Sequence, residues 1–241
     1  MIHEWPLEWY GKFTSMTFRL QSLNFTAPHR WTGGKSTFGA IAQLWVVKLS
    51  LGPIRWNEEG QAMAAFFDNL GGQSGRIRIG DRLRQLPQRD RTLSGEEAWS
   101  DGTFFSEDES GFVDGLLPPF VTLGVAASRG ASYVVLDGLP PSEAAVLRRG
   151  DHIEFRPNGI PSVLPALHTV VKFDGNTDAD GSCGIYIAPP LRINLAAGDV
   201  AILSNPTSVF YPIDDEQGSP EITGPEFMNM GFTLIEAIVD G

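Results

Sequence analysis

Apolar and polar residues alternate near the start of the chain in the manner of an extended strand. Met16, Phe18 and Leu20 fall on one side, with polar residues between them, which is the two-residue period of a half-buried β-strand. Residues 42–51 (AQLWVVKLSL) are more continuously apolar, as expected for a strand covered on both faces. Between these segments, residues 26–39 are polar and rich in glycine, so we expect a long hairpin loop there.

The period then changes to that of a helix over residues 57–70. Its apolar residues form one stripe at helical spacing, made of Met63, Phe66, Phe67 and Leu70. Asn57 can cap the first turn, and two glycines follow the last turn. We expect this stripe to pack on a sheet, with at least one of Phe66 and Phe67 deeply buried. Residues 76–79 alternate again and predict a strand.

The second half of the chain predicts a further group of short strands, at residues 152–155, 168–173, 184–187 and 200–203. Two segments in this half, residues 147–153 and 195–201, share the pattern Leu-x-x-Gly-Asp. Each Gly-Asp pair predicts a tight turn that leads into a strand.

These patterns predict a mainly β protein with a discontinuous first domain. We expect a helix-backed β-sandwich formed by residues 1–119 and 214–241, with a small β-barrel or sandwich domain inserted at residues 120–213. Residues 88–119, rich in glycine, serine and acidic residues, predict a long surface loop before the insertion. The apolar segment 227–239 is expected to return to the sheet of the first domain. The 27 glycines and 17 prolines, spread without a period, fit a turn-rich sheet protein.

Composition narrows the classes of function. A net charge of −11 argues against sequence-specific nucleic-acid binding, which needs a basic face. No apolar run approaches the roughly 18–20 residues that cross a bilayer, so we expect no membrane insertion. The first residues lack a signal-peptide pattern, and the single cysteine, Cys183, excludes an internal disulfide framework and a multi-cysteine zinc site. We therefore expect a protein made and folded in a cytoplasm.

Motifs for nucleotide and calcium binding are incomplete. Residues 33–37 (GGKST) resemble the end of a phosphate-binding loop, but His29 stands where the motif needs glycine. Residues 176–181 resemble half of a calcium loop, but Asn176 replaces its first aspartate and Ile187 its bidentate glutamate. We expect an inter-strand loop and an acidic hairpin turn.

Catalytic constellations are not recognised either. The histidines, His3, His29, His152 and His168, have no metal-like spacing and share no motif with Cys183. We interpret His152 and His168 as strand residues with a hydrogen-bond partner. The sequence thus predicts no catalytic residue, no metal site, no cofactor and no enzymatic activity.

Aromatic residues near chain ends and loops leave one alternative open. Trp5, Trp9 and Trp31 are expected to be exposed, and exposed aromatics bury at protein interfaces or bind sugars. Together with the acidic loop residues, they allow a carbohydrate-binding or carbohydrate-cleaving module as an alternative function.

Two stretches of the chain have a recognisable order of motifs. The first comprises residues 32–33, the strand around Trp45, the helix at 57–70, and the turns at 72–75 (GQSG) and 79–81 (IGD). The second comprises the Leu147-x-x-Gly150-Asp151 motif, His168, residues 187–192 (IAPPLR) and residues 206–210. Together they resemble the distal tail protein family of long-tailed (siphovirus-type) phages and gene transfer agents.

The resemblance implies a virion structural protein of the tail tip, or baseplate, made in the cytoplasm of the host bacterium. Its expected partners are other copies of itself in a ring, usually hexameric, together with the tail tube protein and the hub or tail fibre proteins. A hub or other minor tail protein is the alternative within this class. For the contact between subunits we predict the loop formed by Trp31, Thr32, Gly33, Gly34, Lys35, Ser36, Thr37 and Phe38, which has an aromatic residue at each end and two glycines that let it adapt.

Overall fold

The computed structural model of the chain describes residues 2–6, 9, 12–28, 35–55, 57–91, 117–157, 165–173, 175–215, 221–223 and 227–237. For residues 23–28, 35–42 and 221–223 it describes the backbone alone. The chain divides into two compact units, Met1–Ile79 with Val209–Ile238, and Gly80–Ser208 with Val239–Gly241. No helix in the described residues is long and apolar enough to cross a membrane.

The second unit begins at Gly80 and its main segment ends at Ser208. The predicted insertion began at residue 120 and ended at residue 213, so both observed boundaries lie earlier in the chain. Residues 80–91 group with the second unit because they are fastened to it by hydrogen bonds. The backbone N–H of Gln88 donates to Asp151 at 2.9 Å, and the Asp90 carboxylate accepts the N–H of Leu117 at 3.1 Å. Residues 88–91 form a helical turn, and the rest of the predicted loop, residues 92–116, lies outside the described residues.

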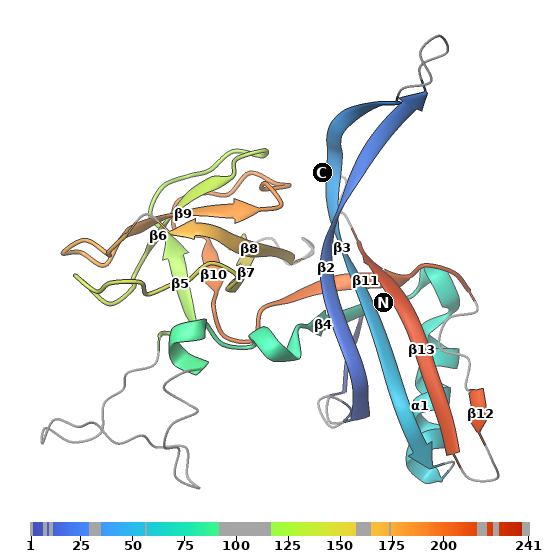
Figure 1. The fold of residues 1–241 in the computed structure, drawn as a ribbon. Helices are drawn as coiled ribbons and strands as arrows, with labels where there is room; N and C mark the ends of the chain where they lie inside the picture. Colours follow the sequence, from blue (N-terminus) through green and yellow to red (C-terminus); the bar gives the residue numbers. More distant parts are fainter. Residues whose placement is uncertain are drawn as a thin grey trace, which may run out of the picture. The chain divides into compact units, whose positions relative to one another are not determined.

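The first unit is built on one mixed sheet (Figure 1). The sheet has the order β1-β4-β11-β13-β3-β2, with β12 paired to β13, among the described residues. Its strands are β1 (Ile2–Glu4), β2 (Phe13–Pro28), β3 (Lys35–Arg55), β4 (Arg76–Gly80), β11 (Thr207–Pro212), β12 (Glu221–Thr223) and β13 (Phe227–Glu236). Strand β13 pairs with both β3 and β11. The prediction that the last apolar segment returns to the first sheet is therefore confirmed.

The buried face of this sheet follows the alternation of its strands. Trp45, Val47, Leu49 and Leu51 of β3 are all buried, whereas Lys48 between them is exposed. The prediction that residues 42–51 are covered on both faces is thus wrong, because only one face of β3 is fully buried. The opposite face meets water.

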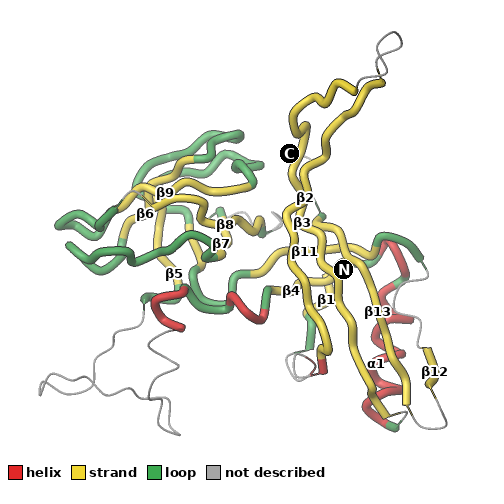
Figure 2. The backbone as a smooth tube through the Cα atoms, in the orientation of Figure 1, coloured by secondary structure: helices red, strands yellow, loops and turns green. Residues whose placement is uncertain are grey.

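The predicted helix is confirmed as α1 (Glu58–Leu70), drawn in red in Figure 2. The Asn57 side chain accepts a hydrogen bond from the N–H of Gly60 at 3.3 Å, and Gly71 ends the helix in the left-handed conformation with φ 74°. A short 3₁₀ helix, η2 (Gly72–Ser74), follows and leads into β4. Local sequence signals alone place this helix correctly.

The apolar stripe of α1 is buried by an aromatic cluster that the sequence does not predict. Trp5 is 4% exposed and its ring lies 5.7 Å from that of Phe232 on β13. Phe67 also contacts Phe232, at 4.8 Å between ring centroids. Phe66 contacts the rings of Trp5 and Trp9, and Phe67 contacts that of Phe232. Each phenylalanine remains half-buried, so the prediction that at least one of them is deeply buried is wrong.

The expectation that Trp5 and Trp9 are exposed is wrong. The N–H of Trp5 donates to the carbonyl of Arg78 at 3.1 Å, so the N-terminal segment continues beside β4 and brings both indoles over α1. Trp9 is 6% exposed. Trp31 lies outside the described residues.

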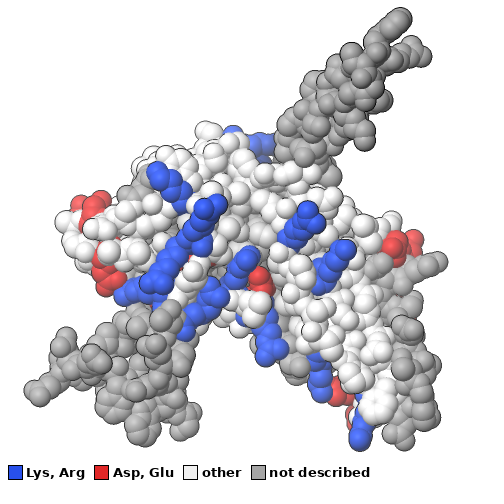
Figure 3. All heavy atoms as spheres, in the orientation of Figure 1, with Lys and Arg blue, Asp and Glu red and all other residues white. Residues whose placement is uncertain are grey.

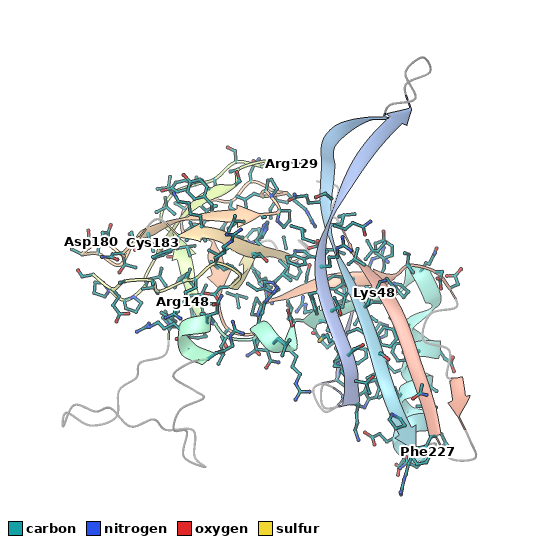
Figure 4. All side chains as sticks on the ribbon, in the orientation of Figure 1. Lys48, Arg129, Arg148, Asp180, Cys183 and Phe227 are labelled. Atoms are coloured by element: carbon teal, nitrogen blue, oxygen red, sulfur yellow. The ribbon has the colours of Figure 1, made fainter. Side chains whose placement is uncertain are left out.

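The second unit contains a closed barrel of order β10-β5-β6-β9-β8-β7. Its strands are β5 (Phe120–Leu123), β6 (Tyr133–Asp137), β7 (His152–Arg156), β8 (Ala166–Phe173), β9 (Cys183–Ala188) and β10 (Val200–Ile202); a short 3₁₀ helix, η3 (Arg82–Arg84), precedes it. Leu136, Ile153, Phe155 and Ile185 are among its fully buried residues, and Cys183 lies with them in the same core (Figure 4). The mainly β fold, a helix-backed sheet together with a small barrel, is as predicted.

Candidate assembly interface

Strand β2 forms one edge of the first unit's sheet. It pairs with β3 along its length, from Phe13 opposite Leu51 to Pro28 opposite Lys35, and stands last in the strand order. In the described part of the chain, no strand pairs with its other side. An edge strand presents backbone N–H and C=O groups with which a strand of another chain can pair. This edge is therefore a candidate surface for assembly.

On the side of Trp45 that leads back to Lys35, the β2–β3 hairpin leaves the sheet and continues as a two-stranded ribbon. Strand β13 accompanies β3 from Arg55 to Val46, and the next N–H, that of Trp45, donates to the buried carboxylate of Glu236 at 3.1 Å. From Trp45 to Lys35, the strand paired with β3 in the described residues is β2 alone. Figures 1 and 2 show the hairpin extending past the other strands of its sheet.

The long loop predicted at residues 26–39 is wrong in its extent. Thr26 lies opposite Thr37 and Ala27 opposite Ser36, so both segments are paired strands. Two paired strands form backbone hydrogen bonds with each other even where neither face is buried. Polar residues in such a segment therefore do not by themselves indicate a loop. Of the predicted contact residues, Lys35, Ser36, Thr37 and Phe38 begin β3, whereas Trp31, Thr32, Gly33 and Gly34 lie outside the described residues.

Little in the sequence of β2 opposes pairing with another strand. Register shifts occur between Phe13 and Ser15 and between Leu23 and Phe25, and residues 15–23 between them pair regularly with β3. That stretch contains one charged residue, Arg19, and neither proline nor glycine. Natural proteins usually protect an exposed edge with short strands, several charges, prolines or bulges. A long regular edge with one charge is therefore open to pairing with a strand of another chain.

The two faces of the edge differ in polarity. Thr17 and Gln21 are exposed on one face, whereas Met16 and Phe18 are half-buried on the other. Lys48 of β3, labelled in Figure 4, lies directly opposite Thr17 and is exposed. A strand added at this edge would extend both the polar face and the apolar face of the sheet.

The second unit holds two buried histidines, each with a hydrogen-bond partner as predicted. Nη1 of Arg84 lies 2.8 Å from Nε2 of His152, and Nδ1 of His168 lies 2.7 Å from the carbonyl oxygen of Pro189. Because arginine can only donate, Nε2 of His152 accepts. Burial, reinforced by Arg84 and Arg91, lowers the pKa of His152 to about 3. Burial likewise lowers the pKa of His168 to about 4, so both rings are neutral near pH 7.

Buried carboxylates in this unit bind backbone groups of the unit itself. Asp151 accepts the N–H of Arg148 at 2.7 Å as well as that of Gln88, and Asp90 accepts that of Leu117. Desolvation by burial raises the pKa of both carboxyl groups. Their geometry accounts for the attachment of residues 80–91 to the barrel.

The calcium-like segment forms a turn in which a carboxylate is used internally. Oδ1 of Asp178 accepts the backbone N–H of Asp180 at 3.0 Å and that of Ser182 at 2.7 Å. Across the described ranges, no group of three or more His, Cys, Asp or Glu residues is placed to hold a metal ion.

No protein-family model matches the chain, and no curated protein matches its sequence.

Proposed function

We propose that this chain is a structural virion protein of a phage tail tip or baseplate. In this proposal it assembles into a ring, hexameric by its resemblance to distal tail proteins, that joins the tail tube to the hub and the host-recognition parts. Its partners are other copies of itself, the tail tube protein and the hub or tail fibre proteins, and no reaction is assigned to it.

The observation that carries the proposal is the open edge of β2 with the ribbon beyond it. A heterologous contact between copies closes into a ring when its rotation permits. Pairing of the β2 edge with a neighbouring chain would be such a contact, since the edge of one copy would meet a different surface on the next. Main-chain hydrogen bonds then supply affinity without a large apolar patch.

The test is to shorten the ribbon back to the boundary of the sheet. Leu23 and Ala42 are directly paired, so residues 24–41 can be replaced by Asn-Gly, which favours a two-residue hairpin turn. We expect the shortened chain to melt cooperatively, because the pairs between β3 and β13 lie between Val46 and Arg55, outside the replaced residues. We also expect it to remain monomeric, because it loses residues 24–28 of the β2 edge and the ribbon, which in this proposal reach the neighbouring copy. The wild-type chain should form closed rings, measured by light scattering after size exclusion and by negative-stain electron microscopy.

A matched control separates the strands of the ribbon from the residues that connect them in the sequence. In this control, residues 29–34 are replaced by a Gly-Ser segment of the same length, which keeps both strands. Rings from the control but not from the shortened chain would assign the contact to the strands. Wild-type protein that stays monomeric at high concentration would overturn the proposal. Stoichiometry and position in the particle would distinguish a distal tail ring from a hub or minor tail protein.

A further inference from the structure

The outer wall of the barrel carries two tyrosines and a lysine in one row across three neighbouring strands. Tyr133 on β6 is directly opposite Tyr186 on β9, and Tyr186 is directly opposite Lys172 on β8. The tyrosine rings lie 5.0 Å apart, and Nζ of Lys172 lies 5.0 Å from the centre of the Tyr186 ring. Tyr133 is 43% and Tyr186 38% exposed, so large parts of both rings meet solvent.

Gly184 allows the Tyr133 ring to lie across β9. A Cβ atom at Gly184 would contact the phenol oxygen of Tyr133 and would stand 2.7 Å from Cζ and 2.8 Å from Cε2. Gly184 pairs with Val135, two residues along β6 from Tyr133, so the ring reaches diagonally over the glycine backbone. One side of the ring is thus supported by the sheet, and the exposed area faces outward.

A β-bulge brings Lys172 into the row. Val170 pairs with Ile187 and Lys172 pairs with Tyr186, so Val171 is an extra residue on β8. Bulges of this kind redirect a side chain at functional surfaces. In a regular ladder Val171 would stand opposite Tyr186, and the cation would point to the other face of the strand.

We propose that the row Tyr133–Tyr186–Lys172 binds a pyranose unit that carries an anionic group, such as a uronic acid of a surface polysaccharide. The C–H face of a pyranose is apolar and can stack on an exposed tyrosine ring while its hydroxyl groups stay in water. The Lys172 ammonium, held beside Tyr186, is placed to form a charge-assisted hydrogen bond with a carboxylate on that sugar.

The chemistry of the row favours a sugar over a nucleic acid. A single-stranded nucleic acid needs a positively charged groove that follows its backbone in addition to stacking rings. Lys172 is the single cation of the row, which suits one carboxylate and not a run of phosphates. The proposal does not depend on ring assembly, because the row lies on the barrel wall and not on the β2 edge.

Binding can be tested with the full chain by saturation-transfer difference NMR. The probes are methyl β-glucuronide, methyl β-glucoside and uridine 5′-monophosphate. We expect saturation on the sugar-ring protons of both glycosides, with tighter binding of the glucuronide. Gly184→Ala should weaken glucuronide binding about fivefold, since the added Cβ displaces the Tyr133 ring without removing it.

Three further variants make the test specific. Tyr133→Ala should match Gly184→Ala, and Lys172→Gln should reduce binding of the glucuronide to that of the glucoside. Phe120→Ala is the control, because Phe120 is an exposed aromatic on β5, outside the row, and should bind as wild type does. Absence of saturation on either glycoside, equal binding by wild type and the row variants, or tighter binding of the nucleotide would each overturn the proposal.

Discussion

The carboxylates of Asp151 and Asp199 make the same hydrogen bond, each accepting at 2.7 Å the backbone N–H of the residue three positions earlier. The preceding glycines, Gly150 and Gly198, have φ values of 98° and 89°, a region that favours glycine. The two turns lead into β7 and β10, which pair with each other in the barrel. The repeated Leu-x-x-Gly-Asp pattern is therefore a repeated turn.

Asp151 also binds a residue outside its own turn, and this gives the first prediction. Asp199→Ala should lower the free energy of unfolding by about 1–2 kcal/mol, because the backbone N–H of Ala196 loses its acceptor. Asp151→Ala should cost more, about 3 kcal/mol, because Asp151 also accepts the N–H of Gln88. Urea unfolding followed by circular dichroism measures both losses. Asp180→Ala, at the exposed turn labelled in Figure 4, should change stability by less than about 0.5 kcal/mol; equal losses at 151 and 199 would contradict the prediction.

The second prediction concerns the unit that folds independently. The chain enters and leaves the second unit at neighbouring points, since a Cβ at Gly80 would lie 2.6 Å from the carbonyl oxygen of Pro206. A fragment of residues 80–208 should therefore fold alone and melt cooperatively. The shorter fragment 120–213 should melt at a lower temperature, because it lacks Asp90, buried Leu117 and the hydrogen bond from Gln88 to Asp151. Calorimetry measures the melting temperature of each fragment. Equal melting temperatures would show that residues 80–119 do not stabilise the barrel.

Elements defined by neighbouring residues could be predicted from the sequence. The caps of α1 lie within a few positions of its apolar stripe, and the alternation of Met16, Phe18 and Leu20 marks β2 directly. The Gly-Asp turns are equally local. In these cases the physical cause, a period or a cap, is contained in a short stretch of chain.

Features that depend on strand register could not be predicted. Tyr133 and Tyr186 meet across two strands that are far apart in the sequence, and nothing near either residue indicates its partner. Trp5 lies in a short N-terminal segment whose burial depends on parallel pairing of β1 with β4. That β2 is an edge strand likewise follows from the order of the whole sheet, not from its own residues.

The charge on the visible face of the barrel in Figure 3 differs in sign from the net charge of the whole chain. Lys and Arg side chains gather over the visible face of the barrel, although the net charge of the chain is −11. Residues 92–116 contain seven acidic residues and no basic one: Glu96, Glu97, Asp101, Glu107, Asp108, Glu109 and Asp114. Much of the negative charge is thus carried by one segment and is not spread evenly.

The third prediction is a loss of stability in acid that is due to the buried histidines. Their pKa values in the folded chain, about 3 for His152 and about 4 for His168, lie below the usual value near 6.5. Between these values the unfolded chain binds protons that the folded chain does not, so stability is full above about pH 6.5 and falls as pH decreases toward 4. Each histidine should cost about 2 kcal/mol between pH 7 and pH 5.

Two carboxyl groups act in the opposite direction. The raised pKa of Asp90 and Asp151 means that the folded chain takes up their protons at higher pH than the unfolded chain, which offsets part of the loss. His168→Asn isolates the histidine effect, because asparagine can still donate to the carbonyl of Pro189. Urea unfolding at pH 7 and pH 5 should show a smaller decrease for this variant than for the wild type. Equal decreases would mean that His168 is protonated in the folded chain.

The last prediction concerns the response of assembly to salt. A hexamer would carry six times −11, or −66, formal charges, and such a load opposes association. The proposed contact runs along β2 and includes residues 24–28 in the ribbon. Residues 15–28 contain one charged residue, Arg19, so the contact would be formed chiefly by backbone hydrogen bonds. Raising the salt concentration from 0.01 M to 0.1 M shortens the Debye length from about 30 Å to about 10 Å and should screen the repulsion more than it weakens the contact. Sedimentation velocity across that range should therefore show more rings at higher salt. Rings that dissociate steadily as salt rises would show that ionic contacts hold the subunits together and that the β2 edge is not the main interface.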